Sequence, residues 1–170
     1  MSQVTIINYR PEHQPYFEKF NRAWIEAMFT MEPVDEWVLT NPDKAILEPG
    51  GAILMAACDG VMAGTVGLRK VDDSTFEFTK MAVDENFRRK GIAEAISYAS
   101  FEKAKQLGAR KVILYSNTRN AGAIKLYEKI GFKHIPVEPG VYERANVKME
   151  IGMEEALRRA AAYRKSLSFI

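Results

Sequence analysis

Short apolar runs separated by turn-forming residues make up much of the chain, and such runs are typical of β-strands. The runs cover residues 4–8, 52–58, 61–69, 76–83, 111–116, 132–135 and 145–152. The second, third and fourth runs are linked by the turn residues Asp59-Gly60 and Asp72-Asp73-Ser74. These short links favour an antiparallel meander.

Other segments carry apolar residues three and four positions apart, which predicts amphipathic helices. These segments cover residues 91–107, 121–130 and 153–166, together with a first helix that Pro11 opens. The apolar face of the first helix is expected in the core and comprises Phe17, Phe20, Trp24, Ala27 and Met28. Residues 32–51 show neither period and contain three prolines, so they predict a long loop with one short helix near residues 35–39.

The order of these elements predicts an α/β (α+β) fold with a mixed, mostly antiparallel central sheet flanked by helices. With 170 residues, 47% of them apolar, the chain is long enough to bury the core of one domain. We assign the domain to residues 1–152 and treat residues 153–170 as an extra C-terminal helical extension of the same domain. This last helix is expected to pack on its own domain, and the alternative is packing on a second copy in a homodimer.

The charge balance argues against two classes of partner. Twenty-four basic and twenty-two acidic side chains leave a net charge of +2, which favours neither nucleic acid nor an anionic membrane. Nucleic-acid binding would require the basic residues 88–90 and 158–165 to merge on one face. No apolar stretch is long enough to span a bilayer, and residues 1–9 resemble a strand more than a targeting segment. The single cysteine, Cys58, fits a reducing compartment, so we expect a cytoplasmic protein.

The sequence RRKGIA at residues 88–93 lies where a predicted strand ends and a predicted helix begins. The first turn of a helix has N–H groups without partners and a partial positive charge, so it accepts an anion such as a phosphate. Gly91 lets the anion approach the backbone, and the basic side chains add attraction. The alternative is a solvated loop that contains a glycine. Because Lys90 precedes the glycine, the segment is not a nucleoside-triphosphate loop, and it lacks the second glycine-spaced turn of a dinucleotide fingerprint.

Residues 77–132 resemble the GNAT superfamily of acyl-CoA-dependent N-acetyltransferases. The main motif of that family is Arg or Gln, two residues, Gly, one residue, and then Gly or Ala, as at Arg88, Gly91 and Ala93. A second family motif follows in the right order as Asn120, Ala123, Leu126-Tyr127 and Gly131-Phe132. The resemblance implies a GNAT-like fold over about residues 4–152. It also implies an acyltransferase that moves an acetyl group from acetyl-CoA to a primary amine by direct attack.

The resemblance further implies which residues bind acetyl-CoA. They are Met81, Ala82, Val83, Arg88, Arg89, Lys90, Gly91, Ile92, Ala93, Glu94, Asn120 and Ala123. The backbone of Met81 and Val83 would pair with the pantetheine amides as a neighbouring strand would. The Asn120 side chain would bind the pantetheine arm, or cap the helix that starts at residue 121, and the two roles are compatible.

Acyl transfer from a thioester to an amine needs a base for the amine and a proton for the departing thiolate. The resemblance places the carboxylate base at Glu77, acting directly or through an ordered water, and the alternative is a partly exposed strand carboxylate. Strand alternation predicts that Glu77 shares a face with Thr79, Met81 and Val83. Tyr127 matches the family tyrosine that donates a proton to the thiolate, and the alternative is a core aromatic.

The acceptor is less well defined. Residues 31–50 contain a single lysine, and the family builds its acceptor wall from this region. The acids of this segment are Glu32, Asp35, Glu36, Asp43 and Glu48. They favour a cationic small-molecule or peptide amine, or they form only a solvated surface. The opposite wall is expected to contain Tyr142, Glu143 and Arg144, where Arg144 holds a substrate carboxylate or pairs with a surface acid.

No metal is expected, because neither His13 nor His134 has neighbours in a metal-ligand pattern. A second functional class stays open at this point. It is a non-catalytic acyl-CoA-binding sensor or partner-binding subunit that keeps the phosphate turn. The presence of both Glu77 and Tyr127 favours an enzyme, because a pure binding protein needs neither.

Overall fold

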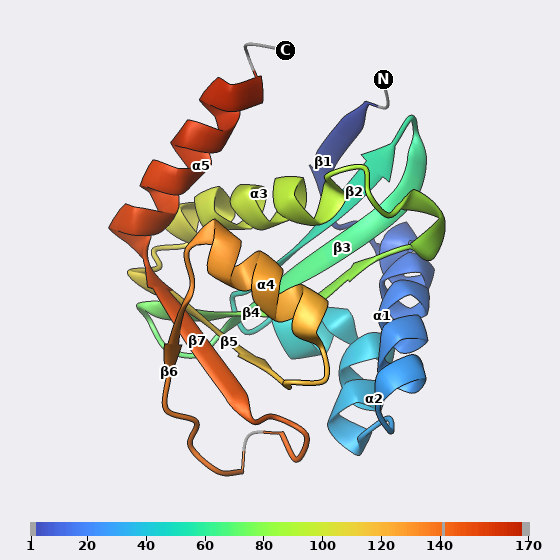
Figure 1. The fold of residues 1–170 in the computed structure, drawn as a ribbon. Coiled ribbons are helices and arrows are strands. Elements are labelled where there is room, and N and C mark those ends of the chain that lie inside the picture. Colours follow the sequence, from blue (N-terminus) through green and yellow to red (C-terminus); the bar gives the residue numbers. More distant parts are fainter. Residues whose placement is uncertain (1–2, 141, 168–170) are drawn as a thin grey trace.

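The structure is a computed structural model that describes residues 3–140 and 142–167 (Figure 1). The strands are β1 Val4–Asn8, β2 Ala52–Cys58, β3 Val61–Lys70, β4 Thr75–Val83, β5 Lys111–Ser116, β6 Lys133–Ile135 and β7 Val147–Gly152. The helices are α1 Gln14–Met28, α2 Pro33–Thr40, α3 Ile92–Gln106, α4 Ala121–Ile130 and α5 Met153–Leu167. The strands form one sheet in the order β1-β2-β3-β4-β5-β7-β6, in which only β4 and β5 pair in parallel. The predicted α/β (α+β) fold with a mixed, mostly antiparallel sheet is confirmed.

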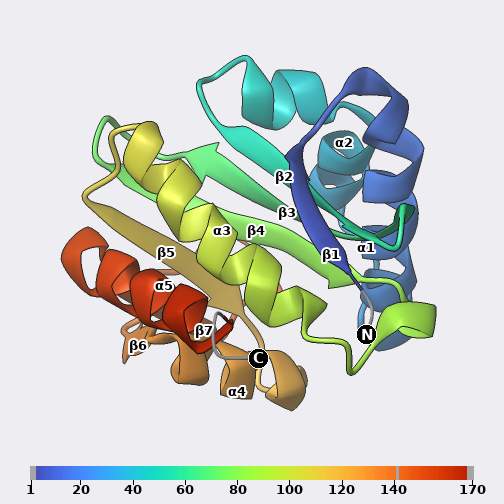
Figure 2. The ribbon, with the colours of Figure 1, turned by 90° about the horizontal axis from the view of Figure 1, so that it is seen from above.

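Strand β2 shows how the sheet is covered on both faces. All seven of its residues are buried. Leu54, Ala56 and Cys58 join the core under α3, α4 and α5, whereas Ile53 and Met55 join the core under α1 and α2. Figure 2 shows these two groups of helices on opposite sides of the sheet. Side chains alternate along a strand, so a strand that is covered on both faces has a continuous apolar sequence.

The short helix predicted near residues 35–39 is confirmed as α2, but the rest of residues 32–51 is not one long loop, and that part of the prediction is wrong. The segment contains α2 and a π-helical turn at Asp43–Leu47. Pro33 starts α2, where its missing N–H removes no hydrogen bond, and the Glu32 N–H donates to the Asp35 carboxylate at 3.0 Å. Leu39 and Ile46 anchor the two helical pieces in the core. Each piece is too short to show an apolar period in the sequence.

The buried face of α1 differs in part from the predicted one. Phe17 and Phe20 are buried as expected, but Ala27 and Met28 are exposed, and Trp24 is only half-buried. The other buried positions of α1 are Asn21 and Ile25. Trp24 and Met28 line the cavity described below, which explains why neither is fully buried in the core.

The C-terminal helix α5 packs on α3 of the same chain, as expected. Met153, Ala156 and Ala160 are buried in the core, and the Tyr163 ring stacks on Tyr98 with a centroid distance of 4.5 Å. The division of the chain after residue 152 remains a prediction, and residues 168–170 of the predicted extension lie outside the described residues. Within the described residues, none of the helices combines the length and apolarity needed to cross a bilayer.

Strand β4 is interrupted by a bulge at Lys80, which the sequence does not predict. Lys80 has a φ of +54°, and the pairing of β3 with β4 shifts at this point. An extra residue in a strand reverses the faces of all later side chains. Met81 and Val83 therefore pack against the same core as Phe78, on the face opposite Glu77. The prediction that Glu77, Met81 and Val83 share a face is wrong for this reason.

Candidate active site

Strands β4 and β5 separate after a short paired stretch. Thr75, Phe76 and Glu77 pair with residues 111–113 of β5, and the rest of β4 up to Val83 has no partner on that side. A cavity of about 650 Å³ follows this opening. It runs along β4, past the turn before α3, to the start of α4. The free backbone edge of β4, at Met81 and its neighbours, can pair with an extended amide-containing ligand as a strand would.

The turn before α3 presents an open helix N-terminus. Arg89 has a φ of +63° and Gly91 a φ of +75°, so the chain turns sharply into the helix. Gly91 is the N-cap of α3 and has no side chain that could cap the first turn. A Cβ at Gly91 would meet no atom within 4 Å, so space is open beside the backbone here. The predicted anion site therefore fits a phosphate group of a CoA substrate.

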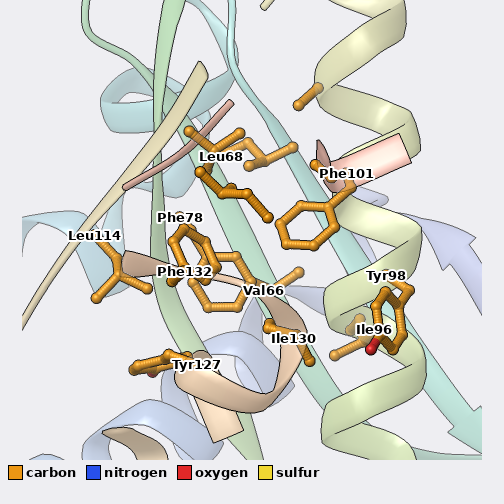
Figure 3. Packing of buried hydrophobic residues seen from close by; sticks show 14 of the residues in the cluster. Val66, Leu68, Phe78, Ile96, Tyr98, Phe101, Leu114, Tyr127, Ile130 and Phe132 are labelled. Atoms are coloured by element: carbon orange, nitrogen blue, oxygen red, sulfur yellow. The ribbon is translucent and has the colours of Figure 1, made fainter. Parts of the chain in front are cut away.

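Tyr127 lies at the boundary between the core and the cavity. It is 9% exposed and packs edge-on against Phe78 and Phe132, with centroid distances of 5.7 and 6.1 Å (Figure 3). It also lines the cavity. Burial raises the pKa of the Tyr127 hydroxyl above its ordinary value, so the group is a protonated phenol at neutral pH. The alternative of a core aromatic is confirmed, and the role of proton donor stays a prediction.

Asn120 precedes α4 at the N-cap position, but its side chain makes no capping hydrogen bond. The helix-cap role predicted as one alternative is therefore not realised. Asn120 and Ala123 both line the cavity. The Asn120 amide is available to a ligand that lies along β4.

Glu77 lines the cavity and is buried, with 1% exposure. Its Oε1 accepts a hydrogen bond from Nε of Arg69 at 2.9 Å, and Nη2 of Arg69 is also 2.9 Å away. Its Oε2 accepts a hydrogen bond from the Tyr142 hydroxyl at 3.0 Å. The alternative of a partly exposed carboxylate is wrong. Burial, followed by the Glu77 charge, raises the pKa of Tyr142.

A second buried ionic group adjoins the first. Asp35 is fully buried and binds Arg144 at 2.6 and 2.8 Å and Lys80 at 3.2 Å. Arg144 also binds Glu32 at 2.8 Å. Burial raises the pKa of Asp35, but the hydrogen bonds of Arg144 and the charge of Lys80 outweigh it and lower the pKa to about 2. This group ties α2 to β4 and to the segment before β7.

We expect Asp35→Asn to lower the free energy of unfolding at pH 7 by about 3 kcal/mol, because two largely buried cations lose their shared counter-charge. The ordinary pKa of 3.8 exceeds the folded value of about 2, so the wild-type advantage is present above about pH 4 and is lost as the pH falls toward 2. Urea unfolding at several pH values measures this. Glu36→Gln, which removes an exposed partner of Arg22, is the control and is expected to change little; equal losses in the two variants would contradict the prediction.

The acid-rich segment does not line the cavity. Glu32 and Asp35 are paired with Arg144 and Lys80, and Asp43 and Glu48 are exposed outside the cavity. The carboxylates that favoured a cationic acceptor are therefore not part of the cavity wall. Tyr142 and Arg144 line the wall as predicted, but Glu143 does not.

The structure brings almost all predicted site residues together. Every predicted catalytic and CoA-binding residue lines the cavity except Lys90, which lies on the same turn as Arg89 and Gly91, whereas Glu143 and the predicted acidic acceptor residues do not line it. Sequence reasoning missed Trp24, Phe29, Lys80 and Arg119, which also line it. The role of Lys80 could have been predicted from the sequence, because a lysine inside an apolar strand must find a buried partner. In the described part of the chain, no cluster of three or more His, Cys, Asp and Glu side chains is placed to hold a metal ion.

Known proteins are similar to this chain in sequence and in fold. Human N-acetylaspartate synthetase is 34% identical over 122 residues, which are 71% of this chain and 38% of the human protein. The chain spans about a third of the length of the N-acetylaspartate synthetases that it matches. A GNAT family acetyltransferase from Staphylococcus aureus Mu50 shares the fold with a TM-score of 0.80 and 19% identity, covering 89% of this chain and 99% of that one.

Spermidine N-acetyltransferase from Vibrio cholerae, solved in complex with CoA and spermine, has a TM-score of 0.69 and 19% identity. The match covers 91% of this chain and 98% of that one. Residues 9–132 match the sequence profile described as the acetyltransferase (GNAT) family. This range includes the turn at residues 88–93 and the motif at residues 120–132. The chain therefore belongs to the GNAT acetyltransferase family.

Proposed function

We propose that the protein is an N-acetyltransferase that moves an acetyl group from acetyl-CoA to a primary amine by direct attack. The observation that carries this proposal is one continuous cavity that joins the open N-terminus of α3 to Tyr127 and Glu77. A protein that only bound acyl-CoA would need the first part of this cavity but neither of the two side chains. We also retain the cytoplasm as the proposed location, because Cys58 is a buried free thiol.

We assign CoA binding to the two motifs. The phosphates bind the first turn of α3 beside Arg88, Arg89 and Gly91, with Lys90 adding charge from the same turn. The pantetheine arm pairs with the free edge of β4 at Met81, Ala82 and Val83. Side chains from the starts of α3 and α4 complete the cavity wall, namely Ile92, Ala93, Glu94, Asn120 and Ala123. The Vibrio cholerae protein of the same fold was solved in complex with CoA, which supports CoA as the ligand.

The transfer step follows from the placement of two groups. The amine nitrogen attacks the carbonyl carbon of the thioester, the C–S bond breaks, and the nitrogen ends as an amide. The acceptor ammonium loses one proton before the attack and a second one after it. Tyr127 gives one proton to the departing sulfur and regains one from solvent, so one proton is released overall. Both Glu77 oxygens already accept hydrogen bonds, so we propose that Glu77 withdraws the amine proton through an ordered water.

Glu77→Gln is expected to lower kcat/KM by roughly 10-fold to 100-fold near pH 6, where most of the amine is charged. The loss is expected to shrink as rising pH supplies free amine. Thiol release from acetyl-CoA, followed over a range of pH, measures both effects. Glu150→Gln, on β7 and outside the cavity, is the matched control. A loss that does not depend on pH would show that Glu77 only holds Arg69 and Tyr142 in place.

The names of the relatives indicate acceptors of opposite charge. N-acetylaspartate synthetase names an anionic amino acid, whereas spermidine N-acetyltransferase names a polyamine. A primary amine is common to both names, and it is the acceptor class that we propose here. Thiol release with a panel of amines tests the activity itself, and no release with any amine in a protein that binds CoA would contradict it.

A further inference from the structure

We infer that the acceptor carries a carboxylate in addition to its amine, and that Arg119 binds this carboxylate; the inference rests on the proposed transferase function. The acceptor end of the cavity is lined by the charged residues Glu77, Lys80, Arg119 and Arg144. The remaining charged lining residues, Arg88, Arg89 and Glu94, belong to the phosphate turn and the start of α3. Cations therefore outnumber carboxylates on the wall that meets the acceptor.

Three of the four charges at this end are already balanced inside the protein. Glu77 pairs with Arg69, which comes from β3 and lies behind the wall. Lys80 and Arg144 share the carboxylates of Asp35 and Glu32. These pairs are rigid parts of the wall and leave little net charge for a ligand.

Arg119 is the exception. Among the described residues it has no carboxylate partner, and its guanidinium contacts only the Met28 carbonyl oxygen at 3.4 Å and the Phe29 ring at 5.9 Å. Its side chain is exposed, so it lies at the mouth of the cavity. A guanidinium binds a carboxylate through two parallel hydrogen bonds. At this end, the cavity wall thus offers one arginine without a carboxylate partner among the described residues.

Arg119 lies close both to the proposed CoA site and to the residues that would meet the acceptor. Arg119 immediately precedes Asn120, which we assign to the pantetheine arm. Arg144 also lies over the Phe29 ring, at 5.6 Å, so Phe29 brings the β5–α4 turn and the segment before β7 to one place. A carboxylate at Arg119 therefore lies between the cofactor groove and the acceptor wall. A polyamine would instead place a second ammonium beside Arg119, without a free carboxylate to offset the repulsion.

Matched acceptors test the inference. Thiol release is measured with amino acids such as L-aspartate, with the corresponding amino acid amides, and with putrescine and spermidine. We expect kcat/KM for the best amino acid to exceed that for its amide and for both polyamines by at least about 10-fold. Equal or better use of the amides or polyamines would overturn the inference while leaving the transferase activity in place. No release with any acceptor would overturn the proposed function itself, and the inference with it.

Variants at Arg119 locate the effect. Arg119→Gln is expected to raise KM for the amino acid by about 10-fold to 100-fold, with KM for acetyl-CoA unchanged. Arg119→Lys keeps the positive charge but cannot form two parallel hydrogen bonds to a carboxylate, so the increase in KM for the amino acid is expected to be smaller. Arg110→Gln removes an exposed arginine outside the cavity and is the control. An Arg119→Gln variant that raises KM for acetyl-CoA instead would assign Arg119 to the cofactor and overturn the inference.

Discussion

Tyr127→Phe is expected to lower kcat by roughly 100-fold to 10,000-fold while CoA still binds. The ring and its contacts with Phe78 and Phe132 are kept, and only the hydroxyl that lines the cavity is lost. Without that hydroxyl the sulfur must leave as an unprotonated thiolate or take its proton from water. Single-turnover measurements of thiol release give the rate of the chemical step, and calorimetry with CoA gives the affinity.

Tyr98→Phe is the matched control for this prediction. Tyr98 is also 9% exposed, but it stacks on Tyr163 and does not line the cavity. A loss confined to Tyr127→Phe would identify proton donation and not the general cost of removing a buried hydroxyl. Because burial raises the pKa of Tyr127, we expect no fall in the wild-type rate from loss of this proton up to about pH 10. A Tyr127→Phe variant with the wild-type rate would leave Tyr127 a core aromatic only.

The sheet could be predicted from the sequence because its strands obey local rules. Strand β2 has a continuous apolar sequence and is covered on both faces, and β3 follows it after the two-residue turn Asp59-Gly60. The bulge in β4 breaks these rules, and no residue pattern in the sequence around it indicates a bulge. Lys80 adopts a conformation usual for glycine, and only the register with β3 reveals it. The face assigned to Met81 and Val83 was wrong as a result.

The acceptor wall could not be predicted, because its charges pair over long distances in the sequence. Asp35 was interpreted as part of an acidic surface, yet it is buried against Lys80 and Arg144, which follow it by 45 and 109 residues. Composition counts charges but does not show which of them cancel. Arg119 stands out only in the structure, where Glu77, Lys80 and Arg144 are paired with other side chains.

Most of the candidate catalytic and CoA-binding residues come from two sequence motifs, and physical chemistry explains only part of these assignments. The glycine before α3 follows Arg88, Arg89 and Lys90, which favours an anion site, but a solvated loop can have the same composition. Nothing local distinguishes Tyr127 from any other aromatic residue on an amphipathic helix. Its assignment depends on the motif, and the structure adds the position beside the cavity.

Gly91→Glu is expected to weaken CoA binding by more than about 100-fold, because it places a carboxylate where the structure has open space at the α3 N-terminus. Any side chain at this position also strains the backbone, since φ is +75°. Gly91→Ala carries the same strain without the charge, so the difference between the two variants isolates the repulsion of the phosphates. Calorimetry with CoA measures the affinity, and circular dichroism checks that both variants fold. Equal affinities for Gly91→Glu and Gly91→Ala would mean that the phosphates bind elsewhere, and the assignment of the turn at residues 88–93 would then fail.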